Sequence, residues 1–271
     1  DESDTEGPAW WNGLDRSMKL FDGVVHSQFS ERDAAPGNAQ NMTQGYVLAF
    51  MAAHLRNDYT WYSDYIRNNP ESWTSIPTFG QFTDGVYRTV LDNAEDGNVS
   101  PNTMGGSVSL SSATASNINL ATNSTSQHST RALRVRGSST AGTATWFTSG
   151  SGFNAGAHVA LALRVGQVTG AAAQDLTIQI RNGATWSSAK YLTDYGVIAQ
   201  PMDMCVVYNS SGACPIGDLA VRNSMSTIRI PLADFGAHND VEAVRINFGG
   251  DSAYKYFDVD SLAFEGWTAA P

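Results

Sequence analysis

Charged residues are scarce in this chain of 271 residues, since only 15% are Asp, Glu, Lys or Arg. Lysine is the rarest of them, at Lys19, Lys190 and Lys255, and the formal net charge is −10. An acidic surface of this kind repels nucleic-acid phosphates, so we expect no nucleic acid as a partner. No run of apolar residues approaches the roughly 20 residues of a membrane span, so we expect no such span.

Cysteine is almost absent, occurring only at Cys205 and Cys214. The turn sequence Asn209-Ser210-Ser211-Gly212 lies between them, and we predict a disulfide across this loop, with two free core thiols as the alternative. A disulfide would indicate a secreted or periplasmic protein. Cysteine and histidine are too few for a structural zinc site, and we expect no organic cofactor. A signal-peptide pattern is missing too, and we interpret the acidic start as a processed end.

The character of the sequence changes near Gly85, and we predict two domains, residues 1–84 and 85–271. In the first, Asn38 is a candidate N-cap, and apolar residues recur at intervals of three and four up to about Arg56, which predicts a helix. Residues 70–84, with two prolines and a glycine, indicate a linker.

From Val86 onward, apolar residues alternate with polar ones in short runs separated by turn residues. Such a pattern is typical of a β-sandwich, and we predict a mainly β, jelly-roll fold preceded by a small helical segment. The clearest predicted strands are 86–91, 132–136, 158–165, 176–181, 227–232, 244–248 and 256–264.

Three segments of the second domain carry a resemblance: Val90–Gly97, Ile230–Phe235 and Phe257–Phe264. They are similar to the opening strand, the Pro-Leu-x-Asp-Phe segment and the closing strand of carbohydrate-binding-module-like jelly rolls, which are attached to secreted bacterial hydrolases. The resemblance implies that the first and last strands of the sandwich lie side by side. It speaks to the fold far more than to the ligand.

The same resemblance implies a structural Ca²⁺ ion held by acids of these two strands. Carried over residue by residue, the ligands are Glu95 and Asp260, with Asp96 and Asp258 as further candidates. Clustered carboxylates suit an ion that takes six to eight oxygen ligands. The alternative is that these acids only solvate strand ends and turns.

Sugar binding needs exposed aromatic rings, because their faces stack on the apolar C–H groups of pyranose rings. The candidate substrate-binding residues are Trp146, Trp186 and Tyr191, followed by Tyr254 and Tyr256. Packing in the core or at a sheet edge is the alternative for each of them.

In the first domain, Val25–Phe29 and Gln44–Leu55 resemble the end of an α/β-hydrolase catalytic domain of the secreted esterase and lipase type. The resemblance implies that His26 is the general base of a Ser-Asp-His triad. No Gly-x-Ser-x-Gly motif occurs in the chain, although the nucleophile precedes the histidine in that family. The serine and the acid would then come from an N-terminal hydrolase chain or domain outside this sequence.

Three functions therefore stay open. The first is the C-terminal part of a secreted serine hydrolase acting on esters or polyesters, with His26 as its base. The second is a non-catalytic β-sandwich that binds carbohydrate or a cell surface. Across these two hypotheses, the expected partner is an ester or a polysaccharide-associated substrate. The third, a jelly-roll glycosidase or lyase, is weaker, because the predicted strands show no repeated acidic alternation.

Overall fold

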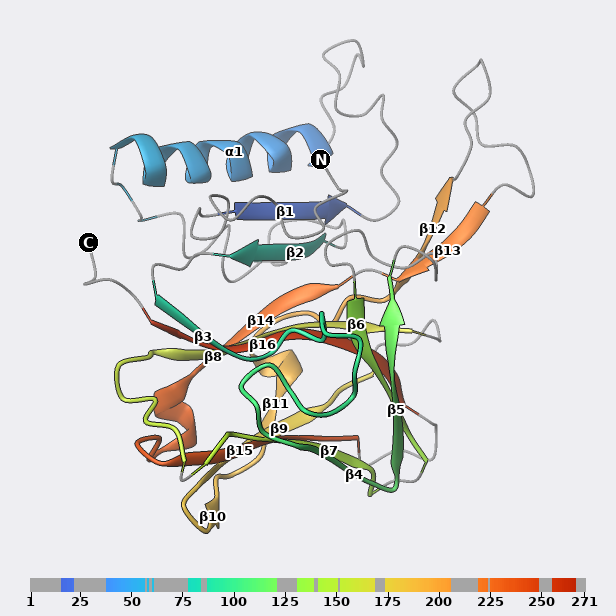
Figure 1. Cartoon of the computed structure of the whole chain (residues 1–271). Helices are drawn as coiled ribbons and strands as arrows, with labels where there is room; N and C mark the ends of the chain where they lie inside the picture. Colours follow the sequence, from blue (N-terminus) through green and yellow to red (C-terminus); the bar gives the residue numbers. More distant parts are fainter. Residues whose placement is uncertain are drawn as a thin grey trace.

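Two antiparallel β-sheets packed face to face make up most of the computed structural model (Figure 1). They form a jelly-roll β-sandwich, which confirms the predicted fold class. The structure describes residues 16–21, 38–56, 58, 60, 78–83, 87–120, 131–138, 141–150, 152–168, 174–205, 219–223, 225–248 and 255–266.

The first sheet, sheet I, has six strands in the order β14-β8-β16-β6-β5, with β3 pairing with β16 as well. The pairing of β3 with β16 places the first and last strands of the sandwich side by side, as the sequence resemblance implies. The strands of sheet I are β3 (Tyr87–Asp92), β5 (Ala113–Asn119), β6 (Arg131–Gly137), β8 (Ala160–Gln167), β14 (Ser226–Pro231) and β16 (Tyr256–Gly266).

The second sheet, sheet II, also has six strands, in the order β10-β9-β15-β7-β4, with β11 pairing with β9. Two short 3-10 helices, η4 (Leu192–Asp194) and η5 (Leu232–Phe235), follow β11 and β14. The strands of sheet II are β4 (Val108–Ser111), β7 (Thr143–Phe147), β9 (Thr177–Asn182), β10 (Thr185–Trp186), β11 (Lys190–Tyr191) and β15 (Val241–Asn247).

The core lies between the sheets, and strand β9 shows how the sequence builds it. Ile178 and Ile180 are buried in the core, while Thr177, Gln179 and Arg181 alternate with them and face outward. Burying an isoleucine side chain stabilises the fold by about 1.5–3 kcal/mol, so the register of such a strand is strongly fixed. Strands β8 and β16 of sheet I are buried along nearly their whole length instead, which requires that both faces of this sheet be covered.

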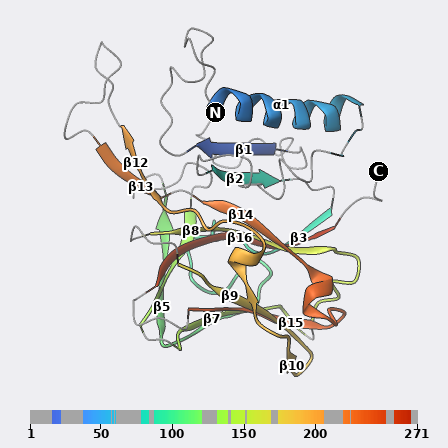
Figure 2. The ribbon, with the colours of Figure 1, turned by 180° about the vertical axis from the view of Figure 1, so that it is seen from behind.

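The cover over the outer face of sheet I comes from the N-terminal part of the chain. Strands β1 (Arg16–Phe21) and β2 (Thr78–Thr83) form an antiparallel pair that lies over this sheet, and α1 (Asn38–Arg56) lies beyond the pair (Figures 1 and 2). A second antiparallel pair, β12 (Pro201–Cys205) with β13 (Leu219–Asn223), extends from one end of the sandwich. Strand β2 corrects the prediction of a linker over 70–84, because residues 78–83 are paired with β1.

Helix α1 has the bounds that the sequence predicts, Asn38–Arg56. Tyr46, Ala49 and Ala53 are buried, at the spacing of one helical face. Large apolar side chains are exposed elsewhere on the helix, at Val47, Leu48, Met51 and Leu55. Within the described residues, none of the helices has the length and apolar character needed to cross a membrane.

Charged side chains line the covered outer face of sheet I. The carboxylate of Asp258 in β16 is fully buried and accepts two hydrogen bonds from Arg134 in β6, at 2.7 Å from Nε and 2.8 Å from Nη2. These bonds raise the pKa of Arg134 further above its usual value. A bidentate pair of this kind is among the strongest ionic contacts in proteins, since two charge-assisted bonds form at once.

Two further acids of β16 are paired on the same face. Oε2 of Glu265 is 2.8 Å from Nε of Arg229 in β14, and its Oε1 is 3.5 Å from Nε of Arg88 in β3. Asp260 lies 3.6 Å from Nη1 of Arg164 in β8. Strands β3, β6, β8 and β14 therefore each contribute one arginine that pairs with an acid of β16. The positions of these charges depend on the order of the strands in sheet I.

We expect Arg134→Met to lower the free energy of unfolding by about 3–5 kcal/mol, because it leaves the buried Asp258 carboxylate without its partner. The measurement is urea denaturation at pH 7. Arg136→Met is the matched control on the same strand, and it should cost less than about 1 kcal/mol because Arg136 is exposed. Equal losses in the two variants would contradict the role given to the Arg134–Asp258 pair.

Candidate functional site

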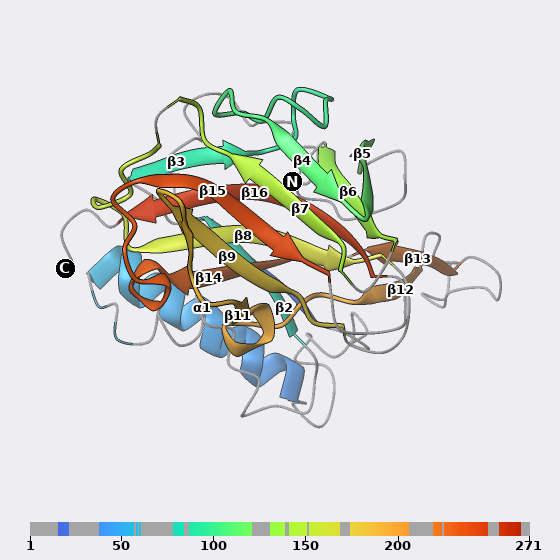
Figure 3. The ribbon, with the colours of Figure 1, turned by 90° about the horizontal axis from the view of Figure 1, so that it is seen from below.

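The outer face of sheet II has no described element lying over it, in contrast to sheet I (Figure 3). Directly opposed residues of antiparallel strands point to the same side, so the register defines this face. One row across it contains Gln179, Arg245 and Thr145, and the next contains Thr177, Asn247 and Thr143. The outward positions of these strands therefore carry amide, hydroxyl and guanidinium groups.

Two aromatic side chains join this polar surface. Trp186 in β10 is opposite Arg181, and Phe147 in β7 is opposite Ala243, which is itself opposite Arg181. Trp186 reaches this position through the tight turn between β9 and β10, in which Gly183 has a φ of 53°. This is a conformation that glycine adopts without steric cost.

Two guanidinium groups lie against these rings. Cζ of Arg245 is 3.9 Å from the centroid of the Trp186 ring, a stacked cation–π contact. Cζ of Arg181 is 5.3 Å from the Phe147 centroid and 5.8 Å from that of Trp186. The aromatic and cationic groups thus form one continuous patch, which we call the sheet II platform: Phe147, Arg181, Trp186 and Arg245.

Tyr191 extends the aromatic character of the face toward the other end of β9. It is opposite Thr177, so it lies on the same side as the platform, and 56% of its surface is exposed. Trp186 and Tyr191 pair with residues four positions apart on β9, which corresponds to about 13 Å along the strand. The separation leaves room for more than one sugar ring between the two aromatic groups.

Gln179 is the centre of a hydrogen-bond network beneath the platform. Its Oε1 accepts hydrogen bonds from Nη2 of Arg245 at 2.7 Å and from Nδ2 of Asn247 at 3.2 Å. Its Nε2 donates to the backbone oxygen of Ser187 at 2.7 Å. The hydrogen bond to Gln179 and the packing against the Trp186 ring together hold the Arg245 side chain in place.

The ionic contacts of the two arginines differ. Nη2 of Arg181 is 2.6 Å from Oε2 of Glu242, whereas Arg245 has no acidic partner among the described residues. Partial burial lowers the pKa of Arg245 from its usual value, and no carboxylate opposes this shift. Arg245 still carries its charge, because the guanidinium group is not deprotonated in proteins.

The structure brings two of the three predicted substrate-binding residues, Trp186 and Tyr191, onto this face. It places the third, Trp146, in the core between the sheets, where only 1% of its surface is exposed and no ring face is free for a sugar. Three residues of the platform were not predicted from the sequence: Phe147, Arg181 and Arg245. The signal for the two arginines was the period-two alternation of β9 and β15, in which they follow buried apolar residues. For Phe147 it was the position next to Trp146 in β7, since successive residues of a strand point to opposite faces.

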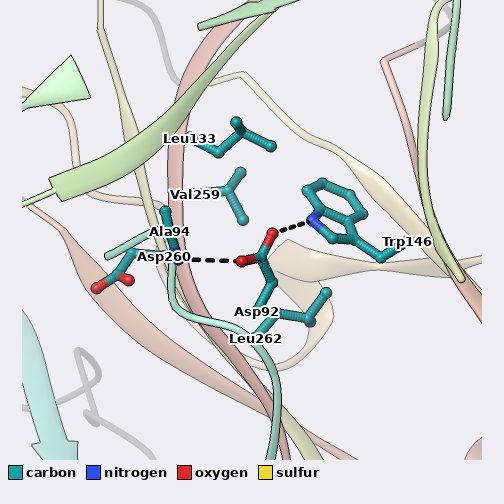
Figure 4. Close-up of a pocket in the computed structure, with 7 residues that line it drawn as sticks. All are labelled: Asp92, Ala94, Leu133, Trp146, Val259, Asp260 and Leu262. Atoms are coloured by element: carbon teal, nitrogen blue, oxygen red, sulfur yellow. Dashed lines mark hydrogen bonds between the residues drawn. The ribbon is translucent and has the colours of Figure 1, made fainter. Parts of the chain in front are cut away.

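Trp146 belongs to a buried polar contact with Asp92 at the end of β3 (Figure 4). The Nε1–H of Trp146 donates to Oδ2 of Asp92 at 2.7 Å, and the N–H of Ala94 donates to Oδ1 at 3.0 Å. The side chains around this contact leave no space for a water molecule, so it is a contact of the packed core.

The four predicted calcium ligands are divided between two environments. Glu95 and Asp96 follow β3, where the first accepts from the N–H of Arg131 and the second from that of Asn98. Asp258 and Asp260 project from the outer face of sheet I and pair with arginines. Across the residues that the structure describes, no three His, Cys, Asp or Glu side chains are grouped as a metal site requires. A bound Ca²⁺ ion stays a prediction.

His26 and Cys214 lie outside the described residues, as do the side chain of Cys205 and the loop that follows it. The triad base and the disulfide therefore stay predictions. Strand β1, which precedes His26, pairs with β2 in an antiparallel manner. The described part of the N-terminal region adds no support to the hydrolase hypothesis.

The sequence matches no protein-family model and no curated protein. Three solved structures are similar to part of it. An exo-β-agarase is 9% identical with a TM-score of 0.43, and the match covers 67% of this chain and 26% of the agarase. The family 11 carbohydrate-binding module of the Clostridium thermocellum cellulase Lic26A-Cel5E is 12% identical with a TM-score of 0.39, covering 68% of this chain and 97% of the module. A β-1,2-glucanase from Parabacteroides distasonis is 13% identical with a TM-score of 0.41, covering 67% of this chain and 25% of the glucanase. The chain thus spans about a quarter of the agarase and the glucanase. Likeness at this level assigns neither a family nor a ligand.

We expect Asp92→Asn to make stability less dependent on pH. Burial raises the pKa of Asp92, and the bonds from Ala94 and Trp146 only partly oppose this. Because the folded pKa lies above the unfolded value, the stability that Asp92 contributes is present below about pH 4 and is lost as the pH rises through the folded pKa.

The free energy of unfolding of Asp92→Asn should therefore rise relative to that of the parent protein between pH 3.5 and pH 7. The gain is about 1.4 kcal/mol for each unit by which the folded pKa exceeds the unfolded one. Urea denaturation at several pH values measures the difference, in which all other titrating groups cancel. A difference that does not change with pH would show that burial does not perturb Asp92.

Proposed function

We propose that this chain is a non-catalytic carbohydrate-binding module and that the outer face of sheet II is its binding surface. The observation that carries the proposal is the joint presence of Trp186 and Tyr191 on an uncovered sheet face, with amide and hydroxyl groups between them. A sugar ring has an apolar face of C–H groups and a rim of hydroxyls. Such a ring is complementary to aromatic surfaces with polar neighbours.

The geometry favours binding over bond cleavage. A glycosidase requires two carboxyl groups that flank the scissile bond. On the described part of this face the acidic side chain close to the platform is Glu242, and it is engaged by Arg181. The groups around the platform can orient a saccharide by stacking and hydrogen bonding, which are the tasks of a binding module.

An uncovered sheet face suits a long ligand. Trp186 and Tyr191 lie at the same edge of sheet II, and the polar rows of β9, β15 and β7 continue from there across the sheet. A polysaccharide chain can contact several such positions in succession, whereas a monosaccharide can contact only one. We infer a polysaccharide as the partner, which agrees with the secreted or periplasmic location predicted from the sequence.

We expect Trp186→Ala to weaken polysaccharide binding by at least about tenfold, because a central aromatic anchor commonly contributes more than 1.4 kcal/mol to an interface. Affinity electrophoresis in gels containing neutral or acidic polysaccharides measures the retardation. Tyr191→Ala should weaken binding in the same direction, since its ring lies on the same face.

The control is Leu55→Ala, which removes an exposed apolar side chain of α1, beyond the outer face of sheet I. This variant should bind as the parent protein does, with an unchanged melting temperature. If the parent protein is not retarded by any polysaccharide, or if Leu55→Ala loses as much affinity as Trp186→Ala, the proposed binding surface is wrong.

A further inference from the structure

The sheet II platform carries more positive than negative side chains, although the chain as a whole is acidic. The chain carries a net charge of −10, yet two arginines and one glutamate surround Trp186. Glu242 binds Arg181, and this pair is neutral as a unit. The charge of Arg245 is therefore left uncompensated among the described residues, at the centre of the proposed sugar surface.

The Arg245 guanidinium is also held in one place. Its plane packs against Trp186, and a single hydrogen bond joins its Nη2 to Gln179, which two further bonds fix in turn. A guanidinium has five N–H donors, and the bond from Nη2 to Gln179 uses one of them. Nε is buried and has no acceptor among the described residues, so further hydrogen bonds to a ligand must come from the two Nη atoms. A fixed cation with free donors loses little conformational entropy when an anion binds, since its order exists beforehand.

Packing alone does not explain this arrangement. A partly buried cation without a counter-ion costs free energy, as the lowered pKa of Arg245 shows. A neutral side chain such as glutamine or methionine could pack on Trp186 and keep the strand register without that cost. The charge becomes favourable when an anionic group lies beside it, which is the role that Glu242 has for Arg181.

We propose that the sheet II platform selects an anionic polysaccharide, in which a carboxylate or sulfate group on the sugar pairs with Arg245 while the ring stacks on Trp186. This inference rests on the proposed function and adds the class of ligand to it. An oxyanion matches the planar fork of the guanidinium, which donates two parallel hydrogen bonds to such a group.

The decisive comparison uses two ligands that differ only in charge: an oligogalacturonide and the same oligosaccharide with its carboxyl groups reduced to alcohols. Isothermal titration calorimetry in 0.15 M salt limits the long-range repulsion from the acidic protein, because the Debye length is then about 8 Å. A sulfated oligosaccharide and its desulfated form provide the second pair and distinguish the two sources of the anion. We expect the charged member of at least one pair to bind at least about tenfold more tightly than its neutral counterpart.

The variants assign that preference to Arg245. Arg245→Gln keeps a planar group that can pack on Trp186 but removes the charge, and it should make the affinities for the charged and neutral members of a pair equal. Arg245→Lys keeps the charge without the fork and should preserve part of the preference. Arg136→Gln, which removes an exposed arginine from sheet I, is the matched control and should leave the preference unchanged.

The outcomes separate this inference from the proposed function. If the neutral and charged members of both pairs bind equally well and Trp186→Ala weakens both, the platform binds carbohydrate but the anionic preference is wrong. If Arg136→Gln reduces the preference as much as Arg245→Gln does, net charge rather than Arg245 is responsible, and the assignment is wrong. If no ligand of either pair binds and neutral polysaccharides are not retarded either, the proposed function itself fails.

Discussion

Burial of acidic side chains on the outer face of β16 is the constraint on which the rest of this structure depends. A carboxylate without a partner is very costly in such a place, so Asp258 and Asp260 each require an arginine from a strand that pairs with β16. Glu265 has two, from β3 beside it and from β14 beyond β8. These requirements fix which strands surround β16 and in what register. They also explain how sheet I can be covered on both faces although its outer face is charged.

The cover over sheet I decides where function can reside. With β1, β2 and α1 over that sheet, the outer face of sheet II is the large sheet surface that the described elements leave open. This face bears the platform, while the polar contact between Asp92 and Trp146 is closed inside the core. The two sheets thus have different tasks, since one joins the sandwich to the N-terminal segment and the other presents side chains to solvent.

The sequence was sufficient for features that depend on local periodicity. The bounds of α1 and the strands of the sandwich follow from apolar spacing, which is a property of neighbouring residues. Residues 78–83 were misread as linker because their pairing with β1 is a contact across more than fifty residues. The same limit applies to the aromatic candidates: Trp146 and Phe147 are adjacent, and only the register of β7 shows that the first is buried and the second faces outward.

The position of Trp186 on the two-residue strand β10 has a consequence for how this protein could change over time. The turn at Gly183 connects β10 to β9 outside the hydrophobic core, so substitutions in the turn would redirect the indole without disturbing the packing of Ile178 and Ile180. Under the proposed function, ligand preference and thermodynamic stability are thereby separable, and selection can alter the first while the second is maintained. A short edge hairpin beside a packed sandwich is in this sense an element that can evolve independently of the core.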